Sequence, residues 1–301
     1  MRLLLIGHGY VGAYLRPRLE AAGGDVTVCD QMLERLAGVR RAVHCRYQDL
    51  SISDLAAFDA ILWFAGHSSV PMALKDPDGA IANNCLDLLQ LAKRKPLKTR
   101  LIYASTGSVY SVEADVSSLP PLMDEAQTLL NPVNAYDCSK ISFDALARCF
   151  VHATTGLRLG TVCGYSEHLR AELIFNAMNC SALREGRVRV ANRHSYRSIL
   201  FLDDLAHYLV ALLAIPSPLP PILNAASFHL SIGALADTIA AFHGVRIETM
   251  PDTRTYSFRM HCGRIDALCG PPPPATLEEH CAAFRDALLK ADPGVRLRQA
   301  S

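Results

Sequence analysis

Tyr136 and Lys140 are the pair of side chains in this sequence best suited to acid–base chemistry. Residues at i and i+4 share one face of a helix, so a helix over this segment brings the two side chains together. A lysine ammonium beside a phenol favours the phenolate and lowers the pKa of the tyrosine. Such a tyrosine can exchange a proton with a substrate hydroxyl or carbonyl while a nicotinamide accepts or donates a hydride. The pair predicts an alcohol–ketone redox site, and a surface pair without chemistry is the alternative.

A threonine near this pair is the next candidate. Thr106 follows the apolar run 100–105 and opens the sequence Thr106-Gly107-Ser108. A hydroxyl at the carboxyl end of a parallel strand points into the ligand crevice of an α/β sheet. Thr106 is therefore expected to hydrogen-bond the same substrate oxygen as Tyr136 and to hold it for transfer. The alternative is an ordinary turn rich in Ser, Thr and Gly.

A glycine-rich segment near the start predicts a dinucleotide site. Residues 7–12 read Gly-His-Gly-Tyr-Val-Gly, which matches G-x-G-x-x-G directly after an apolar run and before a helical pattern. Gly7 is expected to make the tight turn, Gly9 to let a pyrophosphate approach the backbone, and Gly12 to allow close packing of helix and sheet. The amino-terminal end of the helix then faces the anion.

Asp30 indicates which dinucleotide this site takes. It ends the second apolar run, 18 residues after Gly12. A carboxylate at that position accepts the ribose hydroxyls of NAD and repels a 2′-phosphate. NAD is therefore favoured over NADP, although Arg35 lies close enough in the sequence to keep NADP open as the alternative.

The elements that must position these residues alternate between strands and helices. Short apolar runs separated by helical stretches predict a parallel sheet that is covered on both faces. The runs are 2–6, 25–29, 42–45, 60–65, 100–105 and 157–162, and the helical stretches between them include 11–22, 80–93 and 135–154. The fold class predicted is α/β, a Rossmann-type doubly wound parallel sheet.

The second half of the chain is more mixed and predicts a smaller α/β substrate domain interleaved with the first. We expect helices over 168–185, 203–213, 231–243 and 276–290, and strands over 187–190, 199–202 and 222–225. Thr276 and Glu279 have the spacing of a capping box. The predicted domains are 1–164 with 198–227 returning to it, and 165–197 with 228–301.

Composition excludes several other classes. The 301 residues are 50% hydrophobic with a net charge of +1, which excludes a disordered chain and gives no general attraction to nucleic acid or to acidic membranes. No apolar run predicts a signal peptide or a membrane span. Ten cysteines lie scattered without Cys-x-x-Cys or zinc-ligand spacing, so we expect reduced thiols, no metal and a cytoplasmic protein.

The ordered set of motifs resembles the extended short-chain dehydrogenase/reductases, the NAD-dependent sugar epimerase/dehydratase family. The segments that carry the resemblance are 7–12, Asp30, 49–50, 64–66, 83–84, 105–110, 136–140, 157–164 and 197–204. The resemblance implies that Thr106, Tyr136 and Lys140 are catalytic. It also implies a homodimer formed through the helices expected at 80–93 and 135–154.

The same resemblance assigns the binding residues. For the cofactor it implies Gly7, Gly9, Tyr10, Val11, Gly12, Asp30, Asp49, Leu50, Phe64, Ala65, Gly66, Asn84, Tyr136 and Lys140. For a nucleotide-sugar substrate we expect Ser68, Ser108, Arg170, Asn176, Arg197 and Arg259. Arginine suits a diphosphate because its forked donors match phosphate oxygens.

Ser108 narrows the range of reactions that the family resemblance allows. Family members that dehydrate sugars carry an acidic residue at this position, and reductive 3,5-epimerases carry a cysteine. Without a carboxylate at position 108, elimination lacks its general acid. The prediction is therefore an NAD-dependent epimerase acting at a sugar carbinol, most simply C4, with Tyr136 as the acid and base. The alternatives are an NAD(P)H-dependent ketoreductase of a nucleotide-linked keto sugar and a non-catalytic NAD-binding regulator.

Two positions depart from the family pattern. Ser111 follows Tyr110 where the family usually has glycine, and Cys163 replaces the common tyrosine before Gly164. Both are expected at the rim of the cofactor site, so they bear on the shape of the pocket.

Overall fold

A seven-stranded parallel sheet forms the centre of the computed structural model, which describes residues 1–301 except 112–118, 127–131, 133, 151, 254 and 293–301. The strand order is β11-β7-β5-β4-β1-β2-β3, and every neighbouring pair is parallel. The strands are β1 (Arg2–Ile6), β2 (Asp25–Asp30), β3 (Ala42–His44), β4 (Ala60–Trp63), β5 (Arg100–Thr106), β7 (Thr154–Leu159) and β11 (Ile222–Ala225). This confirms the predicted Rossmann-type doubly wound fold.

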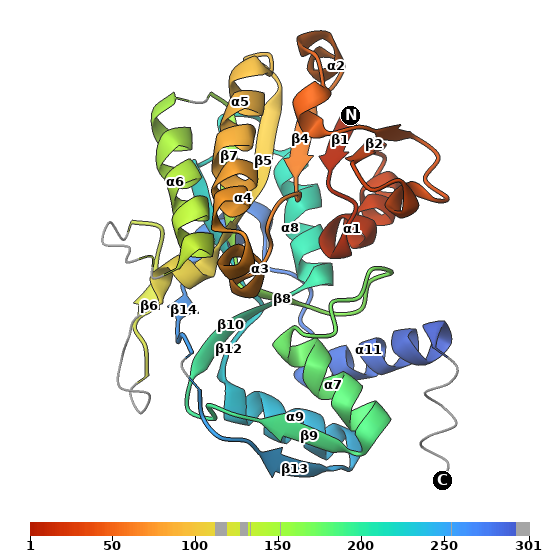
Figure 1. The fold of residues 1–301 in the computed structure, drawn as a ribbon, viewed down its shortest axis with the longest axis vertical. Helices are drawn as coiled ribbons and strands as arrows, with labels where there is room; N and C mark the ends of the chain where they lie inside the picture. The colour runs from red at the N-terminus through yellow and green to blue at the C-terminus, as the bar shows by residue number, and fades with distance from the viewer. Residues whose placement is uncertain (112–118, 127–131, 133, 151, 254, 293–301) are drawn as a thin grey trace.

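Strand β1 shows why the sheet is covered on both faces. Successive side chains of a strand point to opposite faces. Leu3 and Leu5 pack into a core with side chains of helices α1 (Tyr10–Ala21) and α8 (Leu202–Ala214). Leu4 and Ile6 pack on the other face, with side chains of α5 (Asp87–Arg94) and α6 (Ala135–Phe150). Figure 1 shows α5 and α6 on one side of the sheet and α1 on the other.

A smaller lobe lies at the carboxyl edge of the sheet and has its own core (Figure 1). A three-stranded sheet is formed by β8 (Thr161–Cys163), β10 (Tyr196–Phe201) and β12 (Phe228–Ser231). A two-stranded parallel sheet is formed by β9 (Arg187–Val190) and β13 (Arg246–Thr249). Helices α7 (Ile174–Glu185), α9 (Ile232–His243) and α11 (Leu277–Ala291) contribute side chains to this core.

The remaining short elements connect these layers. The helical ones are η1 (Leu33–Leu36), η2 (Tyr47–Asp49), α2 (Ile52–Ala56), α3 (Val70–Lys75), α4 (Pro77–Ile81), η3 (Ala82–Leu86), η4 (Gly107–Tyr110) and α10 (Gly263–Cys269). Strands β6 (Leu122–Met123) and β14 (Arg259–Met260) pair in parallel. The predicted capping box at Thr276 is confirmed at the start of α11.

Several sequence-based boundaries were wrong. The helix expected over 135–154 ends at Phe150, and Thr154 already begins β7. The strand expected over 157–162 is two strands, because the chain leaves the large sheet after β7 and enters the small one at β8. Gly160 makes this crossing possible, since a Cβ there would lie 2.7 Å from the carbonyl oxygen of Ser198. The helix expected over 168–185 begins only at Ile174. The helix expected over 80–93 contains the π-helical turn η3 between α4 and α5.

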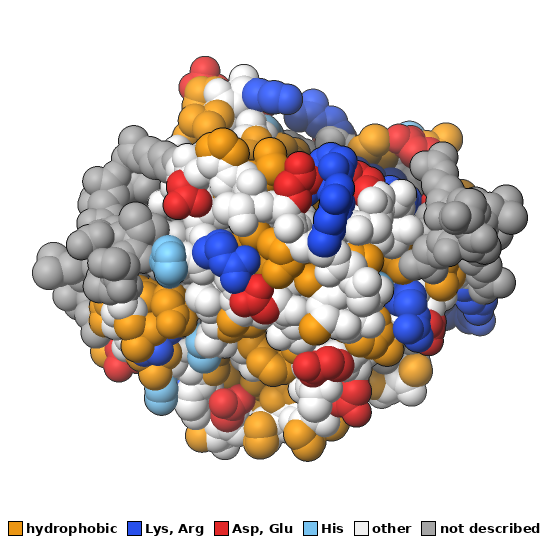
Figure 2. All heavy atoms as spheres, turned by 90° about the horizontal axis from the view of Figure 1, so that it is seen from below, with side chains coloured by type: hydrophobic (Ala, Val, Ile, Leu, Met, Phe, Trp, Pro, Cys, Tyr) orange, Lys and Arg blue, Asp and Glu red, His pale blue; other side chains and the backbone are white. Residues whose placement is uncertain are grey.

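The outer face of the small lobe carries mixed charge (Figure 2). Arg187 lies 3.2 Å from Glu248, and Arg193 lies 2.8 Å from Asp237. Such partly exposed ion pairs contribute little to stability. They do mix positive and negative charges on this face of the lobe. Among the described helices, none is both long and apolar enough to cross a membrane.

Candidate active site

Helix α6 presents Tyr136 and Lys140 toward the carboxyl end of β5. Asn134 begins the helix, because its side-chain oxygen accepts the backbone N–H of Asp137 at 2.9 Å. Lys140 is 5% exposed and donates from Nζ to the carbonyl oxygen of Ala104 at 2.9 Å. Its Nζ lies 6.0 Å from the centre of the Tyr136 ring. The i, i+4 spacing therefore places both groups in one place, as predicted.

The electrostatics of this pair differ from the prediction. Burial raises the pKa of Tyr136 to about 12, and the neighbouring Asp137 carboxylate contributes to the rise. Burial lowers the pKa of Lys140 to about 8, although the Asp144 carboxylate opposes that shift. The expected lowering of the Tyr136 pKa by Lys140 is thus not met, because removal from water disfavours both charged forms and Lys140 directs its hydrogen bond at Ala104.

Thr106 ends β5 beside the phenol. Its Oγ1 lies 2.7 Å from Oγ of Ser108 and accepts the backbone N–H of Ser108 at 3.2 Å. Ser108 in turn donates to the carboxylate of Asp137 in a very short hydrogen bond. Thr106, Ser108 and Asp137 are each less than 8% exposed. The predicted catalytic threonine thus belongs to a buried chain of hydrogen bonds.

The buried carboxylate of Asp144 links helix α6 to the end of strand β5. Asp144 lies one helical turn beyond Lys140 on α6 and accepts hydrogen bonds from Tyr103 at 2.8 Å and from Ser105 at 3.0 Å. Arg158 neutralises the charge, because its Nε donates to Asp144 at 3.0 Å. Ser105 directly precedes Thr106. The network therefore fixes the end of β5 relative to α6.

The glycine-rich turn after β1 has the geometry of a nucleotide cradle. Gly7 has φ +95°, and a Cβ there would lie 2.7 Å from the backbone nitrogen of Ala65. A Cβ on Gly12 would lie 1.9 Å from the carbonyl oxygen of Gly7. A side chain at Gly7 would collide with the backbone that follows β4, and one at Gly12 would collide with the turn itself. The amino-terminal end of α1 thereby stays open to a pyrophosphate.

Asp30 lies at the end of β2 as the ribose prediction requires. Its carboxylate accepts the backbone N–H of His8 at 2.7 Å and of Met32 at 2.8 Å. Arg35 approaches to 3.9 Å, and its Nη1 lies 3.4 Å from the Cβ position of Gly9. The carboxylate is therefore rigidly held beside the cradle, with a cation next to it.

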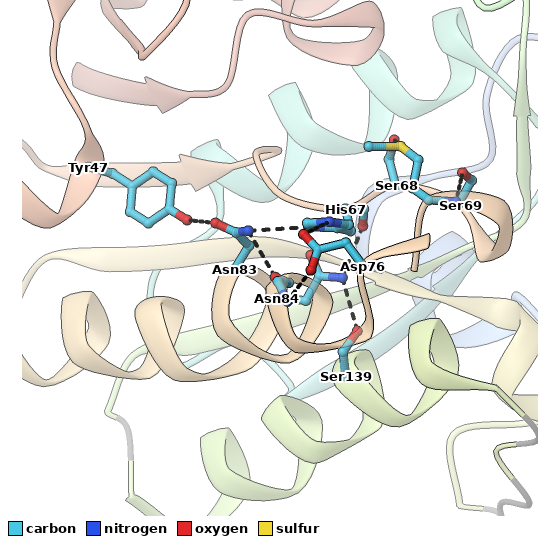
Figure 3. A network of polar contacts seen from close by, with 10 residues as sticks. Tyr47, His67, Ser68, Ser69, Asp76, Asn83, Asn84 and Ser139 are labelled. Atoms are coloured by element: carbon cyan, nitrogen blue, oxygen red, sulfur yellow. Dashed lines mark hydrogen bonds and ion pairs between the residues drawn. The ribbon is translucent and has the colours of Figure 1, made fainter. Parts of the chain in front are cut away.

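A polar network lies between β4 and α6 on the other side of the cradle (Figure 3). Asn84 donates to the carbonyl oxygen of His67 and to Oγ of Ser139, both at 2.9 Å. Its Oδ1 is buried and has no hydrogen-bond partner among the described residues. Gly66 lets this side chain approach, because a Cβ there would lie 2.3 Å from that oxygen. The unpaired acceptor and the glycine cradle fit a bound NAD.

A cavity of about 710 Å³ lies along the catalytic residues and reaches the start of α1. Eight of the predicted cofactor residues are not among those that line it, namely Gly7, Gly9, Gly12, Asp30, Asp49, Leu50, Gly66 and Asn84. Tyr10, Val11, Phe64 and Ala65 from the predicted cofactor set line it. Thr106, Ser108, Tyr136 and Lys140 line it as well, together with Ser68, Arg170 and Arg197 from the predicted substrate set. Its basic side chains, including Arg189, outnumber the acidic ones among the described lining residues, where Glu172 is the acid. The cavity therefore suits an anionic ligand.

Two of the arginines are held in different ways. Arg197 is 7% exposed, lies with its guanidinium carbon 4.3 Å from the centre of the Tyr256 ring, and donates to Thr255 at 2.5 Å. Arg170 donates to Ser68 Oγ at 3.0 Å and pairs with Glu172 at 2.7 Å. Arg197 is thus a fixed cation, whereas Arg170 bridges the two sides of the cavity.

Two residues predicted for substrate do not line the cavity. Asn176 is fully buried, and its side chain is occupied by Gly164, Tyr10 and the backbone of Arg170. Arg259 lies in β14, outside the cavity lining. Asn176 is therefore a structural link between elements.

Two of the predicted cofactor residues, Asp49 and Leu50, lie beside the sheet. Asp49 is exposed at the end of η2, whereas Leu50 is 5% exposed in the core. The backbone of Leu50 accepts a hydrogen bond from Arg94 at 2.7 Å. Its backbone N–H donates to the carbonyl oxygen of Tyr47, so both backbone groups of Leu50 have partners within the protein.

The structure also describes the two residues that depart from the family pattern, Cys163 and Ser111. Cys163 is fully buried in the small-lobe core, and burial raises the pKa of its thiol. Ser111 has a buried hydroxyl without a hydrogen-bond partner among the described residues. Among those residues there is also no cluster of three or more His, Cys, Asp or Glu side chains that could hold a metal.

Comparison with protein families gives a match over residues 3–226, described as "NAD dependent epimerase/dehydratase family". The chain belongs to this family. Similar proteins include a UDP-glucose 4-epimerase of Lacticaseibacillus casei, 29% identical over 157 residues, and a dTDP-glucose 4,6-dehydratase of Mycolicibacterium smegmatis, 31% identical over 170 residues. These alignments cover 48% and 51% of this chain and 44% and 50% of the relatives. The chain thus spans about half the length of the curated relatives it matches.

Solved structures with the same fold include two enzymes of this family. A UDP-glucuronic acid 4-epimerase from Bacillus cereus, in complex with UDP-glucuronic acid and NAD, matches with a TM-score of 0.82 and 18% identity over 97% of this chain and 100% of its own. A dTDP-glucose 4,6-dehydratase from Streptomyces venezuelae, with NAD bound, matches with a TM-score of 0.81 and 20% identity over 98% of both chains. At these identities the likeness establishes the fold.

Sequence reasoning missed two acids of the site. Asp137 stands inside the Tyr136–Lys140 motif, and Asp144 stands one turn after it, yet neither was singled out. Spacing gives a partial signal for Asp144, since residues 136, 140 and 144 share a helix face. Asp137 owes its contact with Ser108 to the meeting of α6 and η4, which only the tertiary structure reveals.

Proposed function

We propose that the protein is an NAD-dependent nucleotide-sugar epimerase that acts by hydride transfer at a sugar carbinol, at C4. One observation carries the proposal: a single cavity is lined by the Thr106, Tyr136 and Lys140 side chains, by Tyr10 and Val11 next to the glycine-rich turn, and by the fixed cation Arg197. Membership of an NAD dependent epimerase/dehydratase family supports it.

Each group has a distinct task in this reaction. The phenol oxygen of Tyr136 removes the proton of the sugar hydroxyl and later returns it to the keto oxygen. Thr106 holds the same oxygen by a hydrogen bond that stabilises the phenolate form, while Lys140 lies beside the phenol. Bound NAD supplies the site that accepts the hydride and gives it back. Inversion follows if the keto sugar presents its other face before the return, while Arg197 and Arg170 keep the diphosphate in place.

A specific contact supports the second candidate, an NAD(P)H-dependent ketoreductase of a nucleotide-linked keto sugar. Arg35 lies 3.9 Å from Asp30, where it can meet a 2′-phosphate. Tight retention of NAD through purification favours the epimerase, because its cofactor is regenerated in every cycle. A protein that is purified empty and turns over only with added NADPH favours the reductase.

The test is to identify the cofactor released from the purified protein by mass spectrometry, and then to offer UDP- and dTDP-sugars as substrates. We expect bound NAD, thermal stabilisation by at least one nucleotide sugar, and formation of its C4 epimer. Tyr136→Phe should retain NAD and lose turnover by about 10²–10⁴-fold, since it removes general acid–base catalysis. Wild-type turnover in Tyr136→Phe would contradict the proposed role of Tyr136. If instead Tyr136→Phe left all biological activity of the protein unchanged, a non-catalytic NAD-binding regulator would be favoured.

A further inference from the structure

Two buried hydroxyl side chains connect the reacting end of the cavity to an acid outside it. Thr106 and Ser108 line the cavity, whereas Asp137 does not and is 1% exposed. The Oγ atoms of Thr106 and Ser108 are 2.7 Å apart, and Ser108 donates to Oδ1 of Asp137. Asn134 donates to the other oxygen, Oδ2, at 2.6 Å. The reacting groups are thus one hydrogen-bond chain away from a carboxyl group.

The orientation of the Asn134 amide is fixed by the backbone. The N–H of Asp137 can only donate, and it reaches Oδ1 of Asn134 at 2.9 Å. The amide nitrogen of Asn134 must therefore be the atom that faces Asp137 Oδ2. Since that nitrogen also only donates, Oδ2 carries no proton. Any proton on Asp137 is on Oδ1, which faces Ser108.

We propose that Asp137 is a positioning residue which, through Ser108, sets the direction in which the Thr106 hydroxyl donates at the reacting oxygens. This rests on the proposed function only in that Tyr136 and Thr106 face the substrate. Each hydroxyl has one proton to give. When Asp137 is ionised, Ser108 donates to it, Thr106 donates to Ser108, and Thr106 offers the cavity only lone pairs.

The order reverses when Oδ1 carries a proton. Asp137 then donates to Ser108, Ser108 donates to Thr106, and the Thr106 proton points into the cavity. A donating Thr106 stabilises the phenolate of Tyr136 and lowers its pKa. A donating Thr106 can also form a hydrogen bond to a ketone oxygen. A Thr106 that only accepts pairs instead with the hydroxyl proton of the neutral phenol. The two orders differ by one proton on Asp137, which is taken up from water, and the change reaches Thr106 by rotation of the two hydroxyl groups. Asp137 thereby decides whether the site favours a ketone oxygen and a phenolate or a neutral phenol.

Other charges around the phenol act alongside this chain. Lys140 and Asp137 face Tyr136 from α6, Tyr256 faces it from the segment before β14, and Arg170 faces it from the segment after β8. The described groups that hydrogen-bond to the Asp137 carboxyl are Ser108 and Asn134, and both are neutral. A test must therefore separate the donor order from the direct effect of the Asp137 charge on Tyr136.

Two variants make that separation. In Asp137→Asn the amide oxygen accepts from Asn134 and the amide nitrogen donates to Ser108, which fixes the reversed order and removes the charge. Ser108→Ala keeps the Asp137 charge and cuts the chain, so that Thr106 is free to donate to the phenol. Cys138→Ala, on the same helical turn and outside the chain, is the matched control.

The readout is the phenolate absorbance of Tyr136 at a fixed pH of about 10. From the spectrum of each variant we subtract the spectrum of the same variant carrying Tyr136→Phe, so that the Tyr136 signal remains. We expect both Asp137→Asn and Ser108→Ala to raise this signal, by about tenfold if the pKa falls by one unit, and Cys138→Ala to leave it unchanged. An unchanged Ser108→Ala signal overturns the proposal, because then only the charge acts. If Asp137→Asn does not fold, as judged by thermal unfolding, Ser108→Ala alone decides. No nucleotide sugar is needed, so failure of the proposed function would not affect this result.

Discussion

At the scale of single residues, the site holds its ionisable groups away from water at a cost in stability. Tyr136 and Lys140 both have pKa values shifted toward their neutral forms by burial. A buried lysine with a lowered pKa disfavours the folded state wherever the unfolded chain keeps the ammonium charged. Such a residue is expected where function rather than stability decides the side chain.

Replacement of Lys140 tests this cost. We expect Lys140→Met to stabilise the cofactor-free protein at pH 7 by about 1–3 kcal/mol, since the pKa is lowered from 10.5 to about 8 and each unit corresponds to about 1.4 kcal/mol. The wild type gains stability as the pH rises from 8 to 10.5, because the unfolded chain binds the extra proton there, so the advantage of the variant should shrink over that range. Denaturant unfolding across pH measures it. A variant less stable than the wild type at pH 7 would contradict this account.

Spacing made part of this site predictable. Tyr136 and Lys140 are brought together by helix periodicity alone, and Thr106 by the rule that parallel strands end at one edge. The direction of the Tyr136 pKa shift was not predictable, because it depends on how deeply α6 is buried. The positions of Asp137 and Asn176 also depend on contacts between distant segments.

At the scale of elements, the start of β5 supports the end of α8. Arg100 is 9% exposed and donates to the carbonyl oxygens of Leu212, Leu213 and Ile215. Those oxygens have no partners inside the helix. A cation there also complements the negative end of the helix dipole. The guanidinium thereby fastens α8 to the central sheet.

Removal of this cap should be costly. We expect Arg100→Met to lower the free energy of unfolding by about 2–4 kcal/mol, because three buried carbonyl groups lose a charged donor. Arg264→Met, which alters an exposed residue of α10, should change it by less than about 0.5 kcal/mol. Equal effects of the two substitutions in urea unfolding would show that the cap does not stabilise α8.

Strands of the large sheet were predictable because both faces are buried, which leaves continuous apolar runs in the sequence. The break between β7 and β8 was not, since residues 157–162 have a strand-like composition on both sides of Gly160, where the chain changes sheets. The region 168–173 lacks helical structure although its composition suits a helix. The carbonyl oxygen of Arg170 instead accepts a hydrogen bond from the side chain of Asn176 in the first turn of α7.

At the scale of the whole molecule, the two lobes are joined at the cofactor side of the cavity. Tyr10, in the first turn of α1, donates to the carbonyl oxygen of Gly164 at 2.7 Å and accepts from Asn176 at 3.1 Å. Asn176 also accepts the N–H of Gly164 at 3.0 Å. The domain division expected from the sequence and the homodimer implied by the family resemblance both stay predictions.

Asn176 is the residue that tests this junction. We expect Asn176→Leu to lower the free energy of unfolding by about 2–4 kcal/mol, since it leaves buried backbone groups of Gly164 and Arg170 without partners. It should also weaken NAD binding, measured by calorimetry, because Tyr10 loses its support beside the cradle. Asn179→Leu, which breaks bonds within the small lobe, should lower stability without changing NAD affinity. If both variants lost the same NAD affinity, the result would contradict the proposed role of Asn176 in joining the two lobes at the cofactor site.

In the proposed reaction, a hydride leaves one sugar carbon and returns to the same carbon. The most direct test is to run the reaction in deuterium oxide with the nucleotide sugar that stabilises the protein, and to examine the product by NMR. We predict inversion at C4 with protium retained on that carbon, because the hydride returns from the bound cofactor rather than from solvent. Deuterium on the inverted carbon, or inversion at a different carbon, would contradict the account.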